Sequence, residues 1–283
     1  MQTRALKKVE QRRKRISFII LLIISFIFII PLIWALATSL KSTDDITYHI
    51  ASLIPYHPTF ENYRTLFNDP AMPIFKWLGN SAIVSITHTL LYLIFASMAG
   101  YAFGVLQWKW RDRIFWILLL TMMIPNVINI IPLFTMIVDL DWFQKLISLI
   151  VPGLGGVFGL FIIRSFFLGI PKELVEAGEM DGLNKFQIFI HIVIPLGKSA
   201  IMVAGLFAFM GSWNDYLWPI LALAGAEVDN YTLPVGLSLL QDNNNYRVGL
   251  TLAAAITSII PVVIVYCFTQ DKIIEGVSRT GIK

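Results

Sequence analysis

Within the long apolar stretches of this 283-residue chain, four consecutive residues are the best candidates to bind a ligand: Trp213, Asn214, Asp215 and Tyr216. Aromatic faces beside an amide and a carboxylate suit a sugar, because its C–H face stacks while its hydroxyls form hydrogen bonds. Asp215 would lie about 24 Å from the start of the predicted helix at 199–224. A carboxylate inside a membrane is by default a candidate for function. The alternative, which we favour, is an aromatic belt at a membrane surface, with Asp215 bonded to a neighbouring helix. Weaker candidates for lining a cavity are Asn126 and Asn129.

The elements that must carry these residues follow from the composition. Hydrophobic residues make up 57% of the chain and charged residues 14%, against about 45–50% and about 25% in average soluble domains. The mean hydropathy is +0.72. A single soluble domain lacks the interior to bury this much apolar surface, and a disordered chain would be far more polar. The single cysteine, Cys267, excludes a disulfide scaffold. The composition therefore predicts an integral membrane protein.

Six apolar stretches reach the roughly 20 residues that a helix needs to cross a bilayer core. They cover residues 16–37, 77–106, 114–138, 146–163, 199–224 and 248–269. Their interior prolines are tolerated in membrane helices, where neighbouring helices satisfy the freed carbonyls. We therefore predict an all-α transmembrane domain of six helices over residues 16–269. It lies between a basic arm at 1–15 and a tail at 270–283.

Seventeen of the 22 Lys and Arg residues lie on one side of this arrangement, in the N-terminal arm, the second and fourth loops and the tail. Because basic residues concentrate on the cytoplasmic side, both termini are predicted to be cytoplasmic. The net charge of +4 is spread between apolar runs rather than gathered in a groove, which argues against nucleic-acid binding. The outer segment at 39–76 exceeds the about 12–15 residues of an ordinary connection, so we expect a folded cap or docking surface rather than a plain linker.

The cytoplasmic loop between the fourth and fifth helices has the pattern of a short helix, a tight turn and a second helix. Pro171 is typical of a helix start, and Asp181-Gly182 is a strong turn signal because glycine adopts positive φ without steric cost. The first helix has an apolar stripe and an acidic face: Leu174, Ala177 and Met180, and Glu173, Glu176 and Glu179. Such an amphipathic element fits a partner's groove or lies on lipid, and the residue pattern alone does not separate these roles.

The same loop resembles the EAA loop of ABC importer permeases, whose pattern is E-A-A, three residues, G, nine residues and I-x-L-P. The matching residues are Glu176, Ala177, Gly178, Gly182, Ile192 and Pro195, and Asp181 is also usual before that glycine. The departures from the pattern are small or conservative: Gly178, Leu183 and Ile194. The stretches PLIWALATSLKS, WNDYLWPILAL, YTLPVGL and GVSRTGIK resemble the MalG-like permease subunits of maltose-type carbohydrate importers. The resemblance covers essentially the whole chain and implies a six-helix permease domain of the MalG/MetI-like type.

The resemblance also implies roles for particular segments. The loop at 170–197 would dock in a cleft of the ATPase, with five coupling residues: Glu176, Ala177, Gly178, Asp181 and Gly182. The outer loop at 225–247 would reach toward a sugar-binding protein, through Gln241, Asp242, Asn243, Asn244 and Asn245. The tail would insert near the seam of the ATPase dimer.

The function implied is a permease subunit of an ATP-driven oligosaccharide importer in the bacterial cytoplasmic membrane. Its partners would be a second homologous permease, a dimeric ATP-binding-cassette ATPase and an extracytoplasmic sugar-binding protein. One alternative is a permease of the same superfamily for sugar phosphates or polyols. A secondary carrier is a poorer fit, because His88 is the only titratable companion of Asp215 well inside a predicted span.

No catalytic residue, cofactor or metal site is expected in the chain itself. Gly197-Lys198-Ser199 looks like the end of a phosphate-binding loop, but position 192, where GxxxxGK[ST] requires glycine, holds Ile192. ATP and Mg²⁺ would therefore be bound by the partner ATPase. The four histidines form no HExxH pair, and one cysteine supplies no zinc site.

Overall fold

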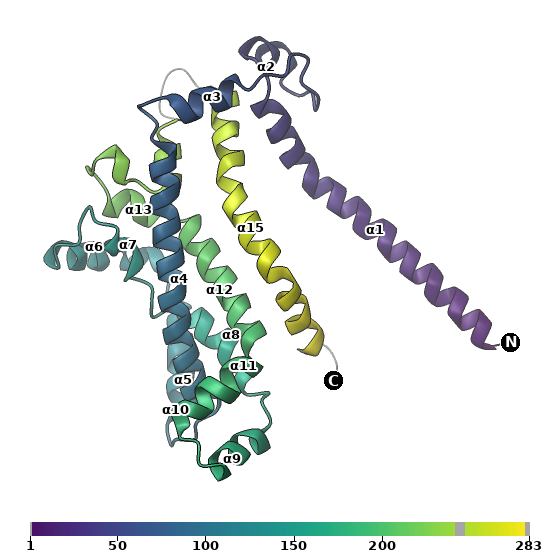
Figure 1. The fold of residues 1–283 in the computed structure, drawn as a ribbon, viewed down its shortest axis with the longest axis vertical. Coiled ribbons are helices and arrows are strands. Elements are labelled where there is room, and N and C mark those ends of the chain that lie inside the picture. Colours follow the sequence, from purple (N-terminus) through teal and green to yellow (C-terminus); the bar gives the residue numbers. More distant parts are fainter. Residues whose placement is uncertain (1, 241–246, 281–283) are drawn as a thin grey trace. The chain divides into compact units, whose positions relative to one another are not determined.

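The computed structural model describes residues 2–240 and 247–280, with side chains at 11–240 and 247–271. The described residues form helices and contain no strand, only an isolated antiparallel bridge between Lys41 and Pro58 (Figure 1). They fall into two compact units, residues 1–72 with 239–257 and residues 73–238 with 258–283.

The first unit is built on one long helix and two short ones. Its elements are α1 (Gln2–Ser39), α2 (Thr43–His49), α3 (Glu61–Asn68) and the beginning of α15 (Val248–Thr280). The side chains of the most apolar window of α1 are not buried among the described residues.

The segment at 39–76 has a polar core of its own. Lys41 is fully buried, and its ammonium donates to the carbonyl oxygens of His49, Ile50 and Ser52 at 2.7–3.0 Å. The carboxylate of buried Asp45 accepts from two backbone amides in the same loop. The segment is therefore folded, and its docking role stays a prediction.

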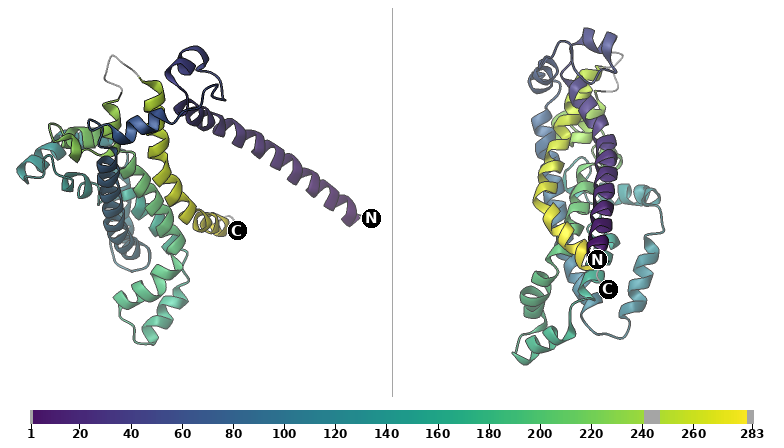
Figure 2. Two further views of the ribbon diagram at one scale, coloured as in Figure 1. Left: turned by 45° about the horizontal axis from the view of Figure 1, so that its top comes forward. Right: turned by 90° about the vertical axis from the view of Figure 1, so that its right-hand side faces the viewer.

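The second unit holds the remaining helices. In chain order they are α4 (Ile74–Gly104), α5 (Arg111–Thr121), η1 (Asn126–Asn129), α6 (Ile130–Asp139), α7 (Ile147–Ile150), α8 (Val157–Phe167), α9 (Lys172–Met180), α10 (Lys185–Ile188), η2 (Phe189–Val193), α11 (Ile194–Leu196), α12 (Lys198–Trp213), α13 (Leu217–Ala222), η3 (Val228–Asn230) and α14 (Leu233–Ser238). The long helix α4 packs on both α8 and α12, and Figure 2 shows these three running side by side.

Small residues allow α4 and α8 to approach closely. A Cβ atom added at Gly100 would lie 2.6 Å from Cγ2 of Ile163, and one added at Gly159 would lie 2.4 Å from the hydroxyl of Tyr92. Close backbone approach through glycine is the usual way for helices to associate in a membrane, where no hydrophobic force drives them together. This α4–α8–α12 core positions the loop that follows α8.

Among the described residues, three helical stretches are continuous and apolar enough to cross a membrane: Gln11–Ser39, Ile74–Gly104 and Val248–Asp271. They correspond to the first, second and sixth predicted spans. The third predicted span is broken instead, because α5 and the η1–α6 segment meet at 87° where Pro125 removes a backbone donor. The fourth contains the four-residue α7 and most of the 11-residue α8, which are separated by a turn at Pro152-Gly153. In the fifth, α12 ends at Trp213 and α13 starts at Leu217. The high average hydropathy of these runs did not predict any of the three breaks.

Candidate functional site: the loop between α8 and α12

The predicted turn at Asp181-Gly182 is confirmed. Helix α9 ends at Met180, and Gly182 follows with φ +84°. The amide of Leu183 donates to the carbonyl of Gly178, and the amide of Gly182 to that of Glu179, both at 3.0 Å. This pair of bonds is the Schellman motif, which closes a helix through a left-handed residue. Nothing lies within 4 Å of a Cβ position at Gly182, so glycine is required here by backbone conformation and not by space.

The second arm of the loop starts with a capping box. The side chain of Asn184 accepts from the amide of Gln187, and the side chain of Gln187 accepts from the amide of Asn184, both at 2.9 Å. The arm continues through the π-helix η2 and meets α12 at 79°. At this bend a Cβ on Gly197 would lie 2.1 Å from Cε1 of Phe167, so the bend depends on close contact with α8.

The two arms are packed on each other and on the membrane helices. Gly178 is buried in α9, and a Cβ there would lie 2.7 Å from Cδ1 of Ile192 in η2. Ile188, Phe189 and Val193 are buried in the same core as residues of α4, α8 and α12. The hydroxyl of Tyr101 in α4 donates to the carbonyl of Lys185 at 2.9 Å. The second arm is therefore in direct contact with three membrane helices.

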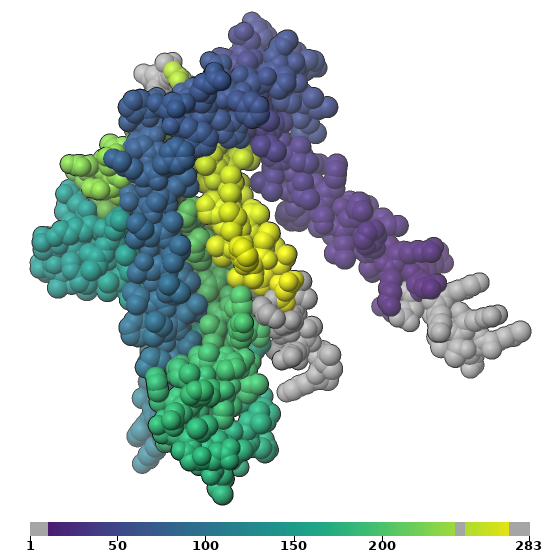
Figure 3. Space-filling model, viewed as in Figure 1, coloured from purple at the N-terminus to yellow at the C-terminus, as the bar shows by residue number. Residues whose placement is uncertain are grey.

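The opposite face of the loop is exposed and mixes apolar with acidic side chains. Met180 is 88% exposed and Phe186 65%. Glu176, Ala177, Asp181 and Gly182 are also exposed. Within the described part of the chain, the α9 glutamates form no ion pair. In Figure 3 this α9–α11 segment, drawn in green, forms one end of the second unit. Such a surface suits a partner that offers an apolar groove and basic groups.

Behind α9 lies a cavity of about 450 Å³ between the loop and the segment that follows α4. Its lining includes Arg111, Lys172 and Lys185 on the cationic side and Glu176 and Glu179 on the anionic side. The first arm thus stands partly free of the membrane helices, whereas the second arm is packed against them.

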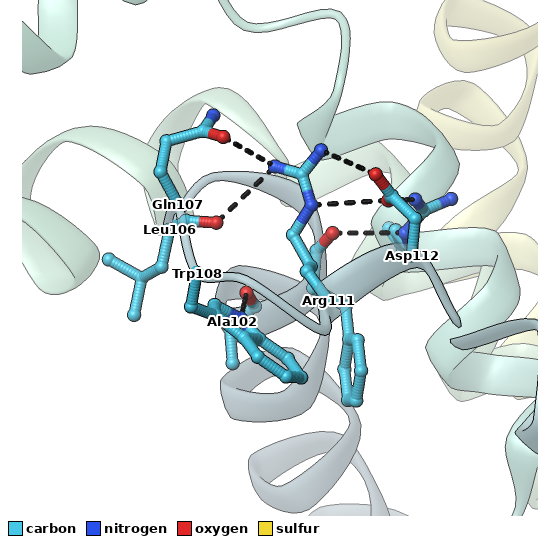
Figure 4. Close-up of polar contacts among 8 residues, drawn as sticks. Ala102, Leu106, Gln107, Trp108, Arg111 and Asp112 are labelled. Carbon is cyan, nitrogen blue, oxygen red and sulfur yellow. Dashed lines mark hydrogen bonds and ion pairs between the residues drawn. The ribbon is translucent and has the colours of Figure 1, made fainter. Parts of the chain in front are cut away.

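A charged cluster lies at the end of α8, immediately before the loop, and Figure 4 shows its Arg111 and Asp112. Arg164 donates from Nε to the carbonyl of Phe103 at 3.0 Å and from Nη2 to Oδ1 of Asp112 at 2.6 Å. Its guanidinium lies 3.8 Å from the ring centroid of Phe115. Arg111 also binds Asp112, through hydrogen bonds of 3.1 and 3.2 Å. Two arginines thus share one carboxylate at the end of α8.

Sequence reasoning missed this cluster. Arg164 was only one of the basic residues that set orientation, and nothing in the spacing of Arg111, Asp112 and Arg164 indicates contact. The available signal was weak: a lone arginine at the end of an apolar run must find a partner or reach water.

The candidate residues for a substrate path are gathered at two helix breaks. Trp213 is 3% exposed, stacks on Phe209 and donates to the carbonyl of Ser258 in α15 at 3.1 Å, which is a packing arrangement. Asn214 bonds back to α12, and Asp215 accepts from the Trp218 amide at 3.4 Å at the start of α13. Tyr216 is 43% exposed. The exposed pair Asn126 and Asn129 lies on η1.

The outer loop after α13 is tied to the start of α4. The indole of Trp77 donates to the carbonyl of Val228 at 2.7 Å, and Lys76 pairs with Asp229. Gly236 lies against the Trp77 ring, where a Cβ would clash at 2.2 Å. The residues predicted to face a binding protein, Gln241, Asp242, Asn243, Asn244 and Asn245, lie outside the described residues.

Comparison with known proteins gives consistent matches along the chain. Residues 93–270 match the family described as binding-protein-dependent transport system inner membrane component. The arabinooligosaccharides transport system permease protein AraQ of Bacillus subtilis is 33% identical over 266 residues, covering 93% of each chain. The lactose transport system permease protein LacG of Rhizobium radiobacter is 29% identical, covering 92% of this chain and 93% of its own.

A solved structure agrees with these matches. In a bacterial ABC transporter involved in the import of the acidic polysaccharide alginate, one chain superimposes with a TM-score of 0.77 at 24% identity. The match covers 90% of this chain and 94% of the other. It confirms the predicted all-α permease fold.

Proposed function

This chain belongs to the family of binding-protein-dependent transport system inner membrane components, and on that premise we propose that it is a permease subunit of a bacterial ABC importer for oligosaccharides. The cargo class rests on relatives named for arabinooligosaccharides and lactose, which match it over nearly its full length. The chain is a multi-pass membrane protein, and in this proposal both of its termini are cytoplasmic.

The loop between α8 and α12 is the coupling element in this proposal. The observation that carries it is the division of the loop into an exposed face of acidic and apolar side chains and a buried face packed on α4, α8 and α12. A cytoplasmic ATPase that receives the exposed face in a groove lined with basic groups would move the second arm when it closes. The second arm in turn would move the membrane helices, because its buried side chains share their core.

ATP and Mg²⁺ are bound by the ATPase and not by this chain, which contains no GxxxxGK[ST] sequence. Two copies of the ATPase, a second permease and an extracytoplasmic binding protein complete the importer. For the substrate path, we assign packing to Trp213 because its ring is buried and its indole bonded. The remaining candidates to contact cargo stay as predicted: Asn214, Asp215, Tyr216, Asn126 and Asn129.

The test has two parts. First, the chain is purified from its native membranes in mild detergent, and recovery of a second permease and an ATPase with a phosphate-binding loop is expected. Second, uptake of labelled oligosaccharides is measured with the proton gradient collapsed and ATP retained. Uptake should continue in the wild type and be lost in Glu176→Lys, whereas Asp139→Lys, at an exposed acidic residue that ends α6 outside the loop, should retain it.

Recovery of the chain alone, or uptake that stops when the gradient collapses, would contradict the importer assignment. Uptake of a phosphorylated sugar or a polyol in place of an oligosaccharide would contradict only the cargo class. Normal uptake by the Glu176→Lys variant would remove the coupling role.

A further inference from the structure

The loop that connects α2 to α3 exposes an apolar surface of unusual density. No charged residue occurs from Ile46 to Phe60. Four large side chains in this stretch are more than half exposed: Tyr48 at 78%, Ile54 at 77%, Phe60 at 72% and Tyr56 at 64%. An uncharged apolar surface of this kind marks a site that contacts lipid or protein.

A hydrogen bond fixes how deep this loop lies along α1. The indole nitrogen of Trp34 donates to the carbonyl of Ile50 at 2.9 Å. Trp34 lies five residues before the end of α1 at Ser39, which is about 7.5 Å back along the helix. It also lies within the apolar run at 16–37. The chain thus folds back beside the last turns of a membrane-spanning helix, as Figure 1 shows next to α2.

Several backbone groups of the loop have hydrogen-bond partners within the same unit. The ammonium of Lys41 donates to three carbonyl oxygens in residues 49–52, and the indole of Trp34 donates to one of the same three oxygens. Asp45 accepts from the amides of Tyr56 and His57 at 2.9 and 3.3 Å. The hydroxyl of Ser52 bonds the backbone of Ile54 in both directions. Irregular backbone can enter a low-dielectric layer only when its polar groups have such partners.

We propose that residues 48–56 form an anchor that lies in the interfacial layer of the bilayer at the Ser39 end of α1. Ile54 and Leu53 would enter the outer edge of the hydrocarbon. Tyr48 and Tyr56, each beside a histidine, lie at headgroup level, where amphipathic rings are favoured. The occupant is lipid, because the Trp34–Ile50 bond holds the loop beside the exposed apolar side chains at the end of α1, and residues 46–60 offer no charge to a protein partner. This anchor is independent of the cargo and of the ATPase.

The test places a fluorophore on the loop in the full-length chain. Ile54→Cys is made in a Cys267→Ala background, since Cys267 is the single native cysteine, and labelled with an environment-sensitive dye. The labelled protein is reconstituted with its importer partners in phosphatidylglycerol–phosphatidylethanolamine vesicles, with and without brominated lipid. The control is Asp44→Cys, an exposed and charged position on α2 of the same cap.

The dye at position 54 should lose about half its emission or more in brominated lipid and respond little to iodide, as expected for an interfacial site. The dye at position 44 should show the reverse. Equal iodide quenching at both positions would overturn the proposal, and so would protection at position 54 that appears only when the binding protein is added. In the Ile54→Cys background, Lys41→Met should lower lipid quenching, because three carbonyls lose their donor. Unchanged quenching there would refute the role given to Lys41.

Discussion

The contact between Gly178 and Ile192 allows a quantitative test of the coupling loop. A leucine at position 178 must enter a space where even a Cβ atom would lie 2.7 Å from Cδ1 of Ile192 and 3.4 Å from Cγ1 of Ile188. Overpacking of this kind costs about 1–3 kcal/mol. If this cost raises the free energy of the state in which the two arms of the loop are packed together, the population of that state decreases by roughly 5- to 150-fold, at 1.4 kcal/mol per tenfold change.

Two companion variants make the reasoning specific. Gly178→Ala should stay close to the wild type, because the atom it meets is the flexible end of Ile192 and alanine favours the helix by about 1 kcal/mol. In the double variant Gly178→Leu with Ile192→Ala, volume is moved across the contact rather than added. Such exchanges cost less than about 1.5 kcal/mol, so most of the activity should return.

The assay is oligosaccharide uptake and ATP hydrolysis by the importer reconstituted in vesicles, with binding protein added. Uptake per ATP hydrolysed should decrease in Gly178→Leu and recover in the double variant. Gly211→Leu is the matched control, because nothing lies within 4 Å of a Cβ at Gly211. Normal coupling in Gly178→Leu, or no recovery in the double variant, would refute the view that contact between the arms transmits the motion.

Three further predictions concern the turn, the charged cluster and a packing tryptophan. Gly182→Ala should lower uptake by about 5- to 30-fold, because a left-handed residue other than glycine costs roughly 1–2 kcal/mol. Gly182→Asn should do less harm, and Gly79→Ala, at an open helical position, should be neutral in the same uptake assay. Arg164→Lys should lower stability by about 1–2 kcal/mol through loss of its bonds to a carbonyl and a carboxylate, whereas Arg13→Lys should not; thermal unfolding in detergent measures both. Trp213→Phe should cost about 1 kcal/mol of stability by the same measurement without changing the apparent KM for uptake, because its indole bonds α15 and not cargo; a raised KM would place Trp213 in the substrate path.

The broken spans are the part of the fold that sequence composition did not predict. A run such as 114–138 carries no charged residue, and its composition is the same whether the helix is straight or bent by 87°. Membrane helices tolerate proline, so Pro125 alone did not predict a break. Whether the carbonyls that proline frees find partners depends on the neighbouring elements. The same holds for Asp215, whose place at the start of α13 follows from the end of α12 at Trp213.

The sequence by itself determined the membrane class, the position of the apolar runs, the EAA-like pattern between Glu176 and Pro195 and the turn at Gly182. These depend on composition and on local backbone conformation, which a few adjacent residues set. Only the tertiary structure decided that Arg164 binds Asp112 and Phe103, that Gly178 faces Ile192, and that buried Lys41 holds a loop against α1. Each of these is a contact between segments distant from one another in space until the chain folds. Helix packing decides which residues meet in each contact, and the spacing of residues in the sequence does not predict that packing.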